Sequence, residues 1–200
     1  MVLAAGAGTR YQSATHKLLA SFRGATVVGW ALEHARTAAL DATWVVTGAI
    51  DLIQAGVVPD GVEVLVNDCW AQGQATSLQV AVAAARTDPT IGSLVIGLGD
   101  QPLVSPEAWR AVARSQERPI AAASYHGRRR NPVRIDRPCW DLLPTTGDEG
   151  ARVLMRQRPD LVMEVPVHDL DDEGDPVDID TVADLADLDE AGGGDTASSL

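Results

Sequence analysis

Short apolar runs alternate with longer segments of helical periodicity along most of the chain. The short runs, which are typical of buried strands, are residues 1–4, 43–47, 62–66, 94–98, 120–123 and 161–165. Apolar residues at helical spacing occupy 26–39, 50–55, 76–86 and 181–188, and a further helix is expected to begin at Ser105-Pro106-Glu107. Strands that alternate with helices predict βαβ units, and therefore an α/β fold with a mainly parallel sheet.

The residues just after each predicted strand are the first place to search for a binding site. In open α/β sheets, ligands bind beyond the carboxyl ends of the strands. Polar or glycine-rich segments follow three of these ends, at residues 5–10, 67–78 and 99–103, and a fourth, 177–181, precedes the last predicted helix. We therefore expect these four segments to meet at one edge of the sheet.

The segment after the first strand reads Ala5-Gly6-Ala7-Gly8-Thr9-Arg10, and the chain's single lysine, Lys17, follows seven residues later. Glycine lets backbone amides approach an anion closely, and a lysine adds a compact charge on a flexible stem. This combination suits a triphosphate. It is not a Walker loop, and it lacks the third glycine of the dinucleotide fingerprint. Taken alone, the lysine's position is equally compatible with chance.

The glycine-containing loop over residues 67–78 leads into a helix whose start carries Gln74, Thr76 and Ser77. Polar groups at this position can read the edge of a base through hydrogen bonds. The alternative is that Thr76 or Ser77 only caps the helix.

Carboxylates follow the fourth predicted strand and precede the last predicted helix. Asp100 stands in Gly99-Asp100-Gln101-Pro102, directly after a buried strand. A carboxylate there is costly to desolvate unless it binds a cation or hydrogen-bond donors, and Mg²⁺ often takes one or two carboxylates plus substrate phosphates. Alternation puts Asp178 and Asp180 on one face of an extended segment, where either can meet Asp100 at one cation. The alternatives are an Asx-turn for Asp100 and, for the later pair, a helix cap or simple membership of the acidic C-terminal segment.

Two further polar segments are candidates for holding an anionic second substrate. They are Arg128-Arg129-Arg130-Asn131-Pro132 and residues 145–152. A solvated loop and a capped helix are the alternatives for these segments.

The distribution of charge narrows the classes of partner. Residues 1–158 hold all 16 basic residues and 14 acidic ones, whereas residues 159–200 hold 14 acidic residues and no basic one. With no broad basic face, nucleic acid binding is not expected. The chain has no apolar run of membrane-spanning length and no metal-ligand spacing among its cysteines and histidines. We expect a cytoplasmic protein that does not bind membranes, with one domain over residues 1–190 and a disordered tail over 191–200.

Together, these segments resemble a known family. The matching pieces are residues 3–10 with Lys17, then 73–78, 99–102, 147–152 and 178–185. They are similar to nucleotidyltransferases of the molybdenum cofactor cytidylyltransferase and guanylyltransferase type, the MobA-like NTP transferases. The resemblance implies a Rossmann-like three-layer fold. It also implies Mg²⁺-dependent transfer of NMP from an NTP, with CTP favoured, to a phosphorylated acceptor such as molybdopterin, with release of pyrophosphate.

The resemblance also implies roles for individual residues. Arg10, Lys17 and Asp100 would act in catalysis, and Asp100 and Asp180 would hold Mg²⁺. The residues that would bind the nucleotide are Leu3, Ala4, Ala5, Gly6, Gly8, Gly73, Thr76 and Ser77. The region 126–152 would receive the anionic acceptor. The implied partners are CTP or GTP, this acceptor, and a molybdoenzyme or its chaperone.

The chain departs from the family pattern at three places, and these leave alternatives open. His16 stands where a proline often precedes the lysine, and Asn131-Pro132 stands where the cytidylyltransferases commonly carry His-Pro. The glycine loop also begins so early that either the first strand is short or the start of the protein lies upstream. One alternative is a guanylyltransferase for a small phospho-acid acceptor in deazaflavin cofactor biosynthesis. Another is a catalytically silent nucleotide-binding module whose acidic C-terminal segment docks a basic partner.

A nicotinamide dehydrogenase is disfavoured by two features of the sequence. The glycine motif differs from the dinucleotide fingerprint, and the second strand ends in Thr47-Gly48 without an acidic residue to hold a ribose.

Overall fold

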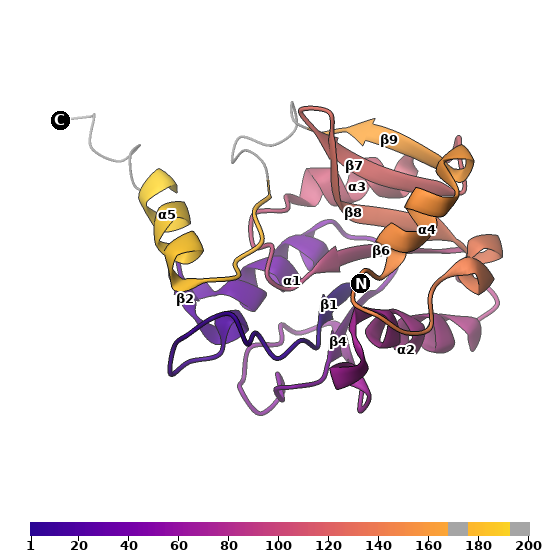
Figure 1. Ribbon diagram of the computed structural model, residues 1–200. Helices are drawn as coiled ribbons and strands as arrows, with labels where there is room; N and C mark the ends of the chain where they lie inside the picture. Colours follow the sequence, from indigo (N-terminus) through magenta and orange to yellow (C-terminus); the bar gives the residue numbers. More distant parts are fainter. Residues whose placement is uncertain (168–175, 193–200) are drawn as a thin grey trace.

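The computed structural model of the protein describes residues 1–167 and 176–192. A seven-stranded sheet forms its centre, in the order β5-β4-β1-β6-β8-β7-β9 (Figure 1). Its strands are β1 (Val2–Ala4), β4 (Thr43–Thr47), β5 (Val62–Val66), β6 (Ser93–Leu98), β7 (Ile120–Tyr125), β8 (Arg128–Asp136) and β9 (Val162–Pro166). A small hairpin, β2 (Ser21–Phe22) and β3 (Ala25–Thr26), lies apart from this sheet. All six strands predicted from the apolar runs are present.

Most neighbouring strands of the large sheet are parallel, as predicted. Strands β5, β4, β1 and β6 pair in parallel, and so do β7 and β9. The exception is β8, which is antiparallel to both β6 and β7. The apolar pattern does not predict this strand, because its first half is the arginine run and its buried aliphatic side chains, Val133 and Ile135, lie near its end.

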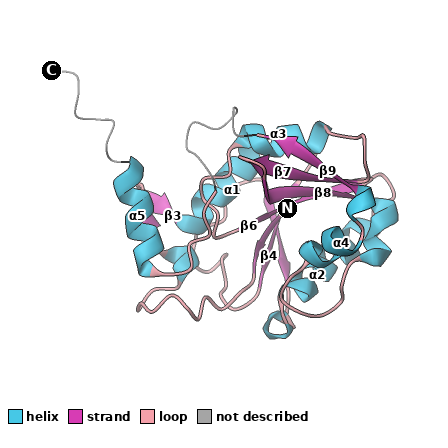
Figure 2. Ribbon diagram, turned by 45° about the horizontal axis from the view of Figure 1, so that its top comes forward, coloured by secondary structure: helices cyan, strands magenta, loops and turns pink. Residues whose placement is uncertain are grey.

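Helices cover both faces of the sheet and form the predicted three layers (Figure 2). The helices are α1 (Val27–Thr37), α2 (Gln74–Arg86), α3 (Pro106–Arg114), α4 (Ala151–Gln157) and α5 (Val182–Gly192). α1 and α3 pack on one face, and α2 and α4 pack on the other. Strand β1 serves both faces: Val2 and Ala4 join the first core, whereas Leu3 joins the second. This alternation is the two-residue period of a strand buried on both sides. None of the described helices is long and apolar enough to cross a membrane.

Side-chain caps begin two of the helices where the sequence predicts them. The Ser105 hydroxyl accepts a hydrogen bond from the Ala108 amide at 3.2 Å, before Pro106 at the first position of α3. At α5, the Thr181 hydroxyl accepts from the Asp184 amide, and the Asp184 carboxylate accepts from the amide of Thr181 in return. This reciprocal pattern is a capping box.

The predicted helix over residues 50–55 is wrong. The Asp51 carboxylate instead accepts hydrogen bonds from the amides of Ile53 and Gln54, at 2.9 and 3.0 Å. Only one helical backbone bond forms there, from Ala55 to Asp51. Gly56 then reverses the chain at φ +68°, so the segment is a single turn. The helix predicted from Thr76 begins two residues earlier, at Gln74.

A third, smaller hydrophobic core holds α5 and the segment before it against the rest of the protein. α5 packs against the β2–β3 hairpin (Figure 1), and Phe22, Leu103 and Leu185 are among the buried residues of this contact. Ile179, in the segment before α5, is fully buried, and its amide donates to the Asp100 carbonyl at 3.0 Å. The backbone of α5 extends through Gly192, two residues into the predicted tail. Residues 193–200 lie outside the described residues.

Candidate functional site

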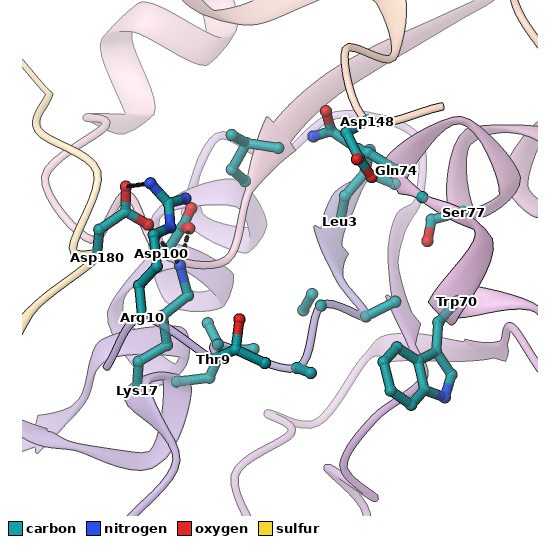
Figure 3. A pocket seen from close by; sticks show the side chains of 18 of the residues that line it. Leu3, Thr9, Arg10, Lys17, Trp70, Gln74, Ser77, Asp100, Asp148 and Asp180 are labelled. Atoms are coloured by element: carbon teal, nitrogen blue, oxygen red, sulfur yellow. Dashed lines mark hydrogen bonds and ion pairs between the residues drawn. The ribbon is translucent and has the colours of Figure 1, made fainter. Parts of the chain in front are cut away.

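A cavity of about 510 Å³ opens at the carboxyl edge of β1 and β6 (Figure 3). It is lined by Leu3, Ala4, Ala5, Gly6, Ala7, Gly8, Thr9, Arg10, Lys17, Leu18, Trp70, Ala71, Gly73, Gln74, Ser77, Leu98, Asp100, Asp148 and Asp180. The structure therefore brings together the four segments expected at the strand ends. Of the residues singled out for nucleotide, catalysis or metal, all but Thr76 and Asp178 line this cavity.

The glycine loop forms one wall of the cavity and is tied to the short 3₁₀ helix Lys17–Leu19. Gly8 has φ +61°, and a Cβ there would lie 3.0 Å from Lys17 Cγ and 3.2 Å from His16 Nε2. Only glycine fits this close approach without a shift of its neighbours. His16 Nε2 donates to the Gly6 carbonyl at 3.1 Å, and His16 Nδ1 accepts from the Leu18 amide at 3.2 Å. One imidazole thus holds the loop and the lysine segment together.

That imidazole is held in its neutral form. Burial lowers the pKa of His16, and the Lys17 ammonium adds to this effect, while the Gly6 carbonyl opposes it. Neutral imidazole carries one donor and one acceptor, which is what these two hydrogen bonds require.

An ion cluster lies at the far end of the loop (Figure 3). Lys17 Nζ is 2.6 Å from Asp100 Oδ2 and 3.2 Å from Asp180 Oδ1. Arg10 Nη1 is 2.8 Å from Asp180 Oδ2. Lys17 is buried although it is charged, which is tolerable because it is paired. Three distant segments of the chain supply these four charges.

Burial and neighbouring charges shift the pKa values of Lys17 and Asp100 within this cluster. Burial opposes the charge of Lys17, but Asp100 and Asp180 outweigh it and raise the pKa of the ammonium. Burial also raises the pKa of Asp100, and Asp178 adds to the rise, while Lys17 opposes it. The two shifts therefore differ in cause: two nearby carboxylates favour the charged form of Lys17, whereas burial disfavours the charged form of Asp100.

The carboxylates of this cluster fit a divalent cation that arrives with phosphate ligands. Asp100 Oδ1 is buried and accepts no hydrogen bond from the described residues. Within the described part of the chain, no group of three or more His, Cys, Asp or Glu side chains could hold a metal by itself. One or two carboxylates completed by substrate phosphates is the arrangement common for Mg²⁺. Asp100 and Asp180 match it.

The loop before α2 forms the opposite wall, and a second loop holds it in place. Gly73 has φ +109°, and a Cβ there would lie 2.6 Å from the Gly147 carbonyl carbon and oxygen. The Ala75 amide donates to that same carbonyl at 2.9 Å. Ser77 lines the cavity, and its hydroxyl lies 2.9 Å from Asn67 Nδ2, which donates to it. Glycine at position 73 is thus required by both conformation and space.

The structure does not bring Thr76 to the cavity. Its hydroxyl is buried within the loop, 2.8 Å from the Gly73 carbonyl and 3.1 Å from the Cys69 carbonyl, and it accepts from Asn67 Nδ2 at 2.9 Å. Thr76 therefore shapes the loop. Of the two adjacent hydroxyls, the one on Ser77 faces the open space (Figure 3).

Sequence reasoning missed Asp148 as a residue of this cavity. It assigned residues 145–152 only to a second substrate, whereas Asp148 lies on the first cavity beside Gln74 (Figure 3). The available signal was the pair Gly147 and Gly150, which marks a loop that another part of the chain approaches closely. A Cβ at position 150 would lie 3.0 Å from Gln74 Oε1.

A second cavity, of about 380 Å³, adjoins the first and shares Leu3, Gln74 and Leu98 with it. Four arginines line it: Arg129, Arg130, Arg152 and Arg156. Arg129 pairs with Glu164 at 2.7 Å, and Arg156 pairs with Glu149 at 2.5 Å. Arg130 and Arg152 form no ion pair with any residue that the structure describes. The buried Nε of Arg130 also lacks an acceptor there.

The arginine run is thus part of a strand and a cavity wall, not the solvated loop considered from the sequence. Asn131, which follows it, also lines the second cavity. Its side chain donates from Nδ2 to Gln101 Oε1 at 2.9 Å, and Gln101 donates from Nε2 to Asp178 Oδ1 at 2.5 Å. Asp178 therefore lines the second cavity, whereas Asp180 lines the first. The two aspartates were expected on one face, but they line different cavities on either side of the buried Ile179.

Sequence and structure comparisons agree with this architecture. A model of the MobA-like NTP transferase domain matches residues 1–162, and the chain belongs to this family of nucleotidyltransferases. Nicotine blue oxidoreductase of Paenarthrobacter nicotinovorans is 32% identical over 193 residues, which cover 91% of each chain.

Solved structures extend the match to nearly the whole chain. Rv0371c from Mycobacterium tuberculosis H37Rv is 33% identical with a TM-score of 0.81, covering 94% of this chain and 95% of that one. Its complex with manganese is 31% identical, with a TM-score of 0.76 and coverage of 94% and 96%. A nucleotidyl transferase of Methanothermobacter shares the fold at 21% identity, with a TM-score of 0.72 and 94% coverage of both chains. The predicted fold class and family are confirmed.

Proposed function

We propose that the protein moves an NMP group from an NTP to a phosphorylated acceptor and releases pyrophosphate, with the help of a divalent cation. The observation that carries this proposal is the cluster of Arg10, Lys17, Asp100 and Asp180 at the end of a glycine loop. The family supports nucleotidyl transfer, and a related structure is a manganese complex.

The ion cluster suits a site in which Arg10 and Lys17 leave their carboxylate partners for the phosphates of the incoming NTP. The triphosphate lies along the glycine loop, with its oxygens towards Arg10 and Lys17. As these two cations turn to the phosphates, Asp100 and Asp180 are left to hold Mg²⁺ or Mn²⁺. Such a cation, when bound, neutralises phosphate charge and polarises the reacting phosphoryl group.

The chemistry needs little from the protein beyond position and charge. An oxygen of the acceptor phosphate bonds to the α-phosphorus of the NTP, and the bond from that phosphorus to the bridging oxygen breaks. Pyrophosphate leaves with the electron pair. Because the acceptor phosphate is already an anion, no general base is needed. Lys17 and Arg10 stabilise the negative charge that grows on the leaving group.

The second cavity is the proposed place of the acceptor. Its unpaired guanidiniums, Arg130 and Arg152, suit a phosphate, which arginine binds through two parallel hydrogen bonds. The two cavities share Leu3, Gln74 and Leu98, so an acceptor phosphate held in one is next to the nucleotide held in the other.

CTP and molybdopterin are the substrate pair that we favour. The segment Gly147-Asp148-Glu149-Gly150-Ala151-Arg152 resembles the cytidylyltransferases that act on molybdopterin, and it borders both cavities. The product would then pass in the cytoplasm to a molybdoenzyme or its chaperone. A small phospho-acid, as in deazaflavin biosynthesis, is the competing acceptor, because two unpaired arginines suit a small anion equally well.

The direct test is pyrophosphate release. Each of the four NTPs is incubated with Mg²⁺ or Mn²⁺ and either molybdopterin, phosphoenolpyruvate or phospholactate. We expect release with one NTP and one acceptor, most strongly with CTP and molybdopterin. Nucleotide binding by calorimetry without pyrophosphate release in any combination would instead support the catalytically silent module.

A second candidate function follows from the relative whose name denotes an oxidoreductase. Nicotine blue oxidoreductase matches 91% of this chain, and Trp70 supplies an aromatic face to the first cavity. Against it, β4 ends in Thr47-Gly48, with no carboxylate for a ribose, and Trp70 packs over Gly48. Oxidation of NADH or NADPH in the presence of nicotine blue, followed by the loss of the reduced nicotinamide's absorbance, decides between the two functions.

A further inference from the structure

Three side chains on the wall of the second cavity form a chain of hydrogen bonds. Asp178 Oδ1 accepts from Gln101 Nε2 at 2.5 Å, and Gln101 Oε1 accepts from Asn131 Nδ2 at 2.9 Å. Gln101 is almost fully buried, with 3% of its surface exposed. All three residues line the second cavity. The chain of bonds therefore runs along the wall of the place proposed for the acceptor.

The carboxylate at one end sets the direction of every bond in this chain. An ionised aspartate can only accept hydrogen bonds, so Gln101 must turn its NH₂ group towards Asp178. The carbonyl of the buried Gln101 side chain then faces Asn131 and needs a donor. Asn131 must therefore turn its own NH₂ group towards Gln101. Reversal of either amide would place two acceptors or two donors against each other in a buried position.

Because the NH₂ group of Asn131 is used by Gln101, its carbonyl oxygen Oδ1 is the atom left for a ligand. No residue that the structure describes donates a hydrogen bond to Asn131 Oδ1. Asn131 and the buried Pro132 lie at an irregularity of the β7–β8 register, and the ladder resumes at Val133, which is opposite Ile96 of β6 and Ala122 of β7. The oxygen is thus an acceptor of fixed orientation on a residue that lines the same cavity as Arg130 and Arg152.

We propose that Asn131 determines the acceptor's chemistry: the molecule in the second cavity is an anion that also carries an O–H or N–H donor near its charged group. The arginines bind the charge, and Asn131 Oδ1 accepts from the neighbouring donor. A ligand that lacks the donor leaves this oxygen unpaired when it displaces water, and so binds more weakly. This inference rests on the proposed function, because it specifies the acceptor of that reaction.

The amide of Asn131 can offer only an acceptor here, because Gln101 and Asp178 fix its orientation.

The test compares two phosphate esters of equal length on the full chain. Glycerol 3-phosphate carries hydroxyl donors, and propyl phosphate does not. Their dissociation constants are measured by NMR titration without nucleotide. For the wild type we expect glycerol 3-phosphate to bind about fivefold more tightly, the size of one ordinary hydrogen bond.

Two variants test whether the preference comes from the chain of hydrogen bonds. Asn131→Leu removes the acceptor and should bring the ratio of the two constants to about one. Asp178→Asn keeps the size of the side chain but lets both amides reverse, so the preference should also be lost although the ligand-facing residue is intact. Asp141→Asn, on the exposed surface, is the matched control and should keep the wild-type ratio. Thermal melts confirm that each variant is folded.

Equal affinities in the wild type would overturn the proposal, and so would a preference that survives in both variants. Failure of glycerol 3-phosphate to bind overturns it as well. Failure of the proposed function gives a different result, the absence of pyrophosphate release with any NTP. A wild type that releases pyrophosphate but binds both esters equally refutes only the role of Asn131.

Discussion

The two adjoining cavities handle charge in opposite ways. In the first, each cation already has an anion: Lys17 contacts Asp100 and Asp180, and Arg10 contacts Asp180. In the second, Arg130 and Arg152 have no carboxylate partner among the described residues. Lysine, with a compact charge on a flexible stem, occupies the first cavity, whereas arginine alone supplies the positive charge of the second.

This difference teaches how one site can handle two phosphorylated substrates. A cluster that is neutralised internally can accept a triphosphate only by exchanging ion pairs, so it depends on a metal to compensate the carboxylates. A cavity with unpaired guanidiniums can bind an anion without any exchange. We therefore expect nucleotide binding to need a divalent cation, and acceptor binding not to need one.

The largest effect is expected from Asp100→Asn, which removes one carboxylate from the ion cluster of the first cavity. The amide retains the shape but cannot hold a cation as the carboxylate does, so turnover should fall by about 10³-fold. Because burial of the charge is costly, folding should be little affected. Pyrophosphate release and the melting temperature measure the two effects. Asp141→Asn is the surface control, and a variant with near wild-type turnover would refute the role of Asp100.

Lys17→Met should have the next largest effect, and it tests whether Lys17 and a metal ion compete for the same carboxylates. The variant should lose about 10²-fold in rate with nucleotide, because the leaving group loses a buried cation. It should also be less stable by about 3 kcal/mol, since two carboxylates lose their partner. Without nucleotide, however, Mn²⁺ should bind it more tightly than the wild type, because the competing ammonium is gone.

Calorimetry with Mn²⁺ alone tests this second consequence of Lys17→Met. Arg36→Met, which removes an exposed cation on α1, is the control and should bind Mn²⁺ like the wild type. Weaker binding of Mn²⁺ in Lys17→Met would show that the lysine does not compete for the carboxylates.

Arg152→Gln tests the second cavity with a smaller effect. The loss of one unpaired guanidinium should weaken binding of the acceptor phosphate by about tenfold, as expected for one charged hydrogen bond. The KM for the nucleotide should not change, because Arg152 does not line the first cavity. Steady-state kinetics with each substrate varied in turn measure both constants. Arg114→Gln, on the surface, is the control, and a rise in the nucleotide KM would contradict the division between the cavities.

The smallest effect concerns pH and His16, which joins the glycine loop to the lysine segment. Its pKa in the folded protein is below the ordinary 6.5, so between these two values the unfolded chain binds more protons. The contribution of His16 to stability is therefore complete above pH 6.5 and is lost as the pH falls through 6.5 towards the lowered pKa. The melting temperature of the wild type relative to His16→Gln, followed from about pH 8 to about pH 5, should fall accordingly. A difference that does not vary with pH would refute this.

The course of the chain was largely predictable because local patterns report local structure. The apolar runs predicted six strands, and Ser105 and Thr181 marked the starts of two helices. The turn at residues 50–55 was misjudged because Asp51 satisfies the amides that a helix would use. Strand β8 was not predicted because its arginines take partners that are remote in the chain: Arg130 lines a cavity, and Arg129 pairs with Glu164 of β9. No local pattern reports that.

The composition of the first cavity also followed from the sequence, since the strand-end rule selects residues by topology alone. In a mainly parallel sheet the carboxyl ends of successive strands meet at one edge, so the glycine loop, Asp100 and Ser77 had to be near one another. The single lysine could be assigned to the same edge on that ground.

Only the tertiary structure decided which partner each side chain takes. Asp178 and Asp180 are two residues apart, yet one turns to Gln101 and the other to Lys17 around the buried Ile179. Thr76 and Ser77 are adjacent, yet only Ser77 faces the cavity. Sequence spacing determines which edge of the sheet a residue reaches. The direction of its side chain depends on hydrogen bonds to segments that are remote in the chain, and these exist only once the whole fold has formed.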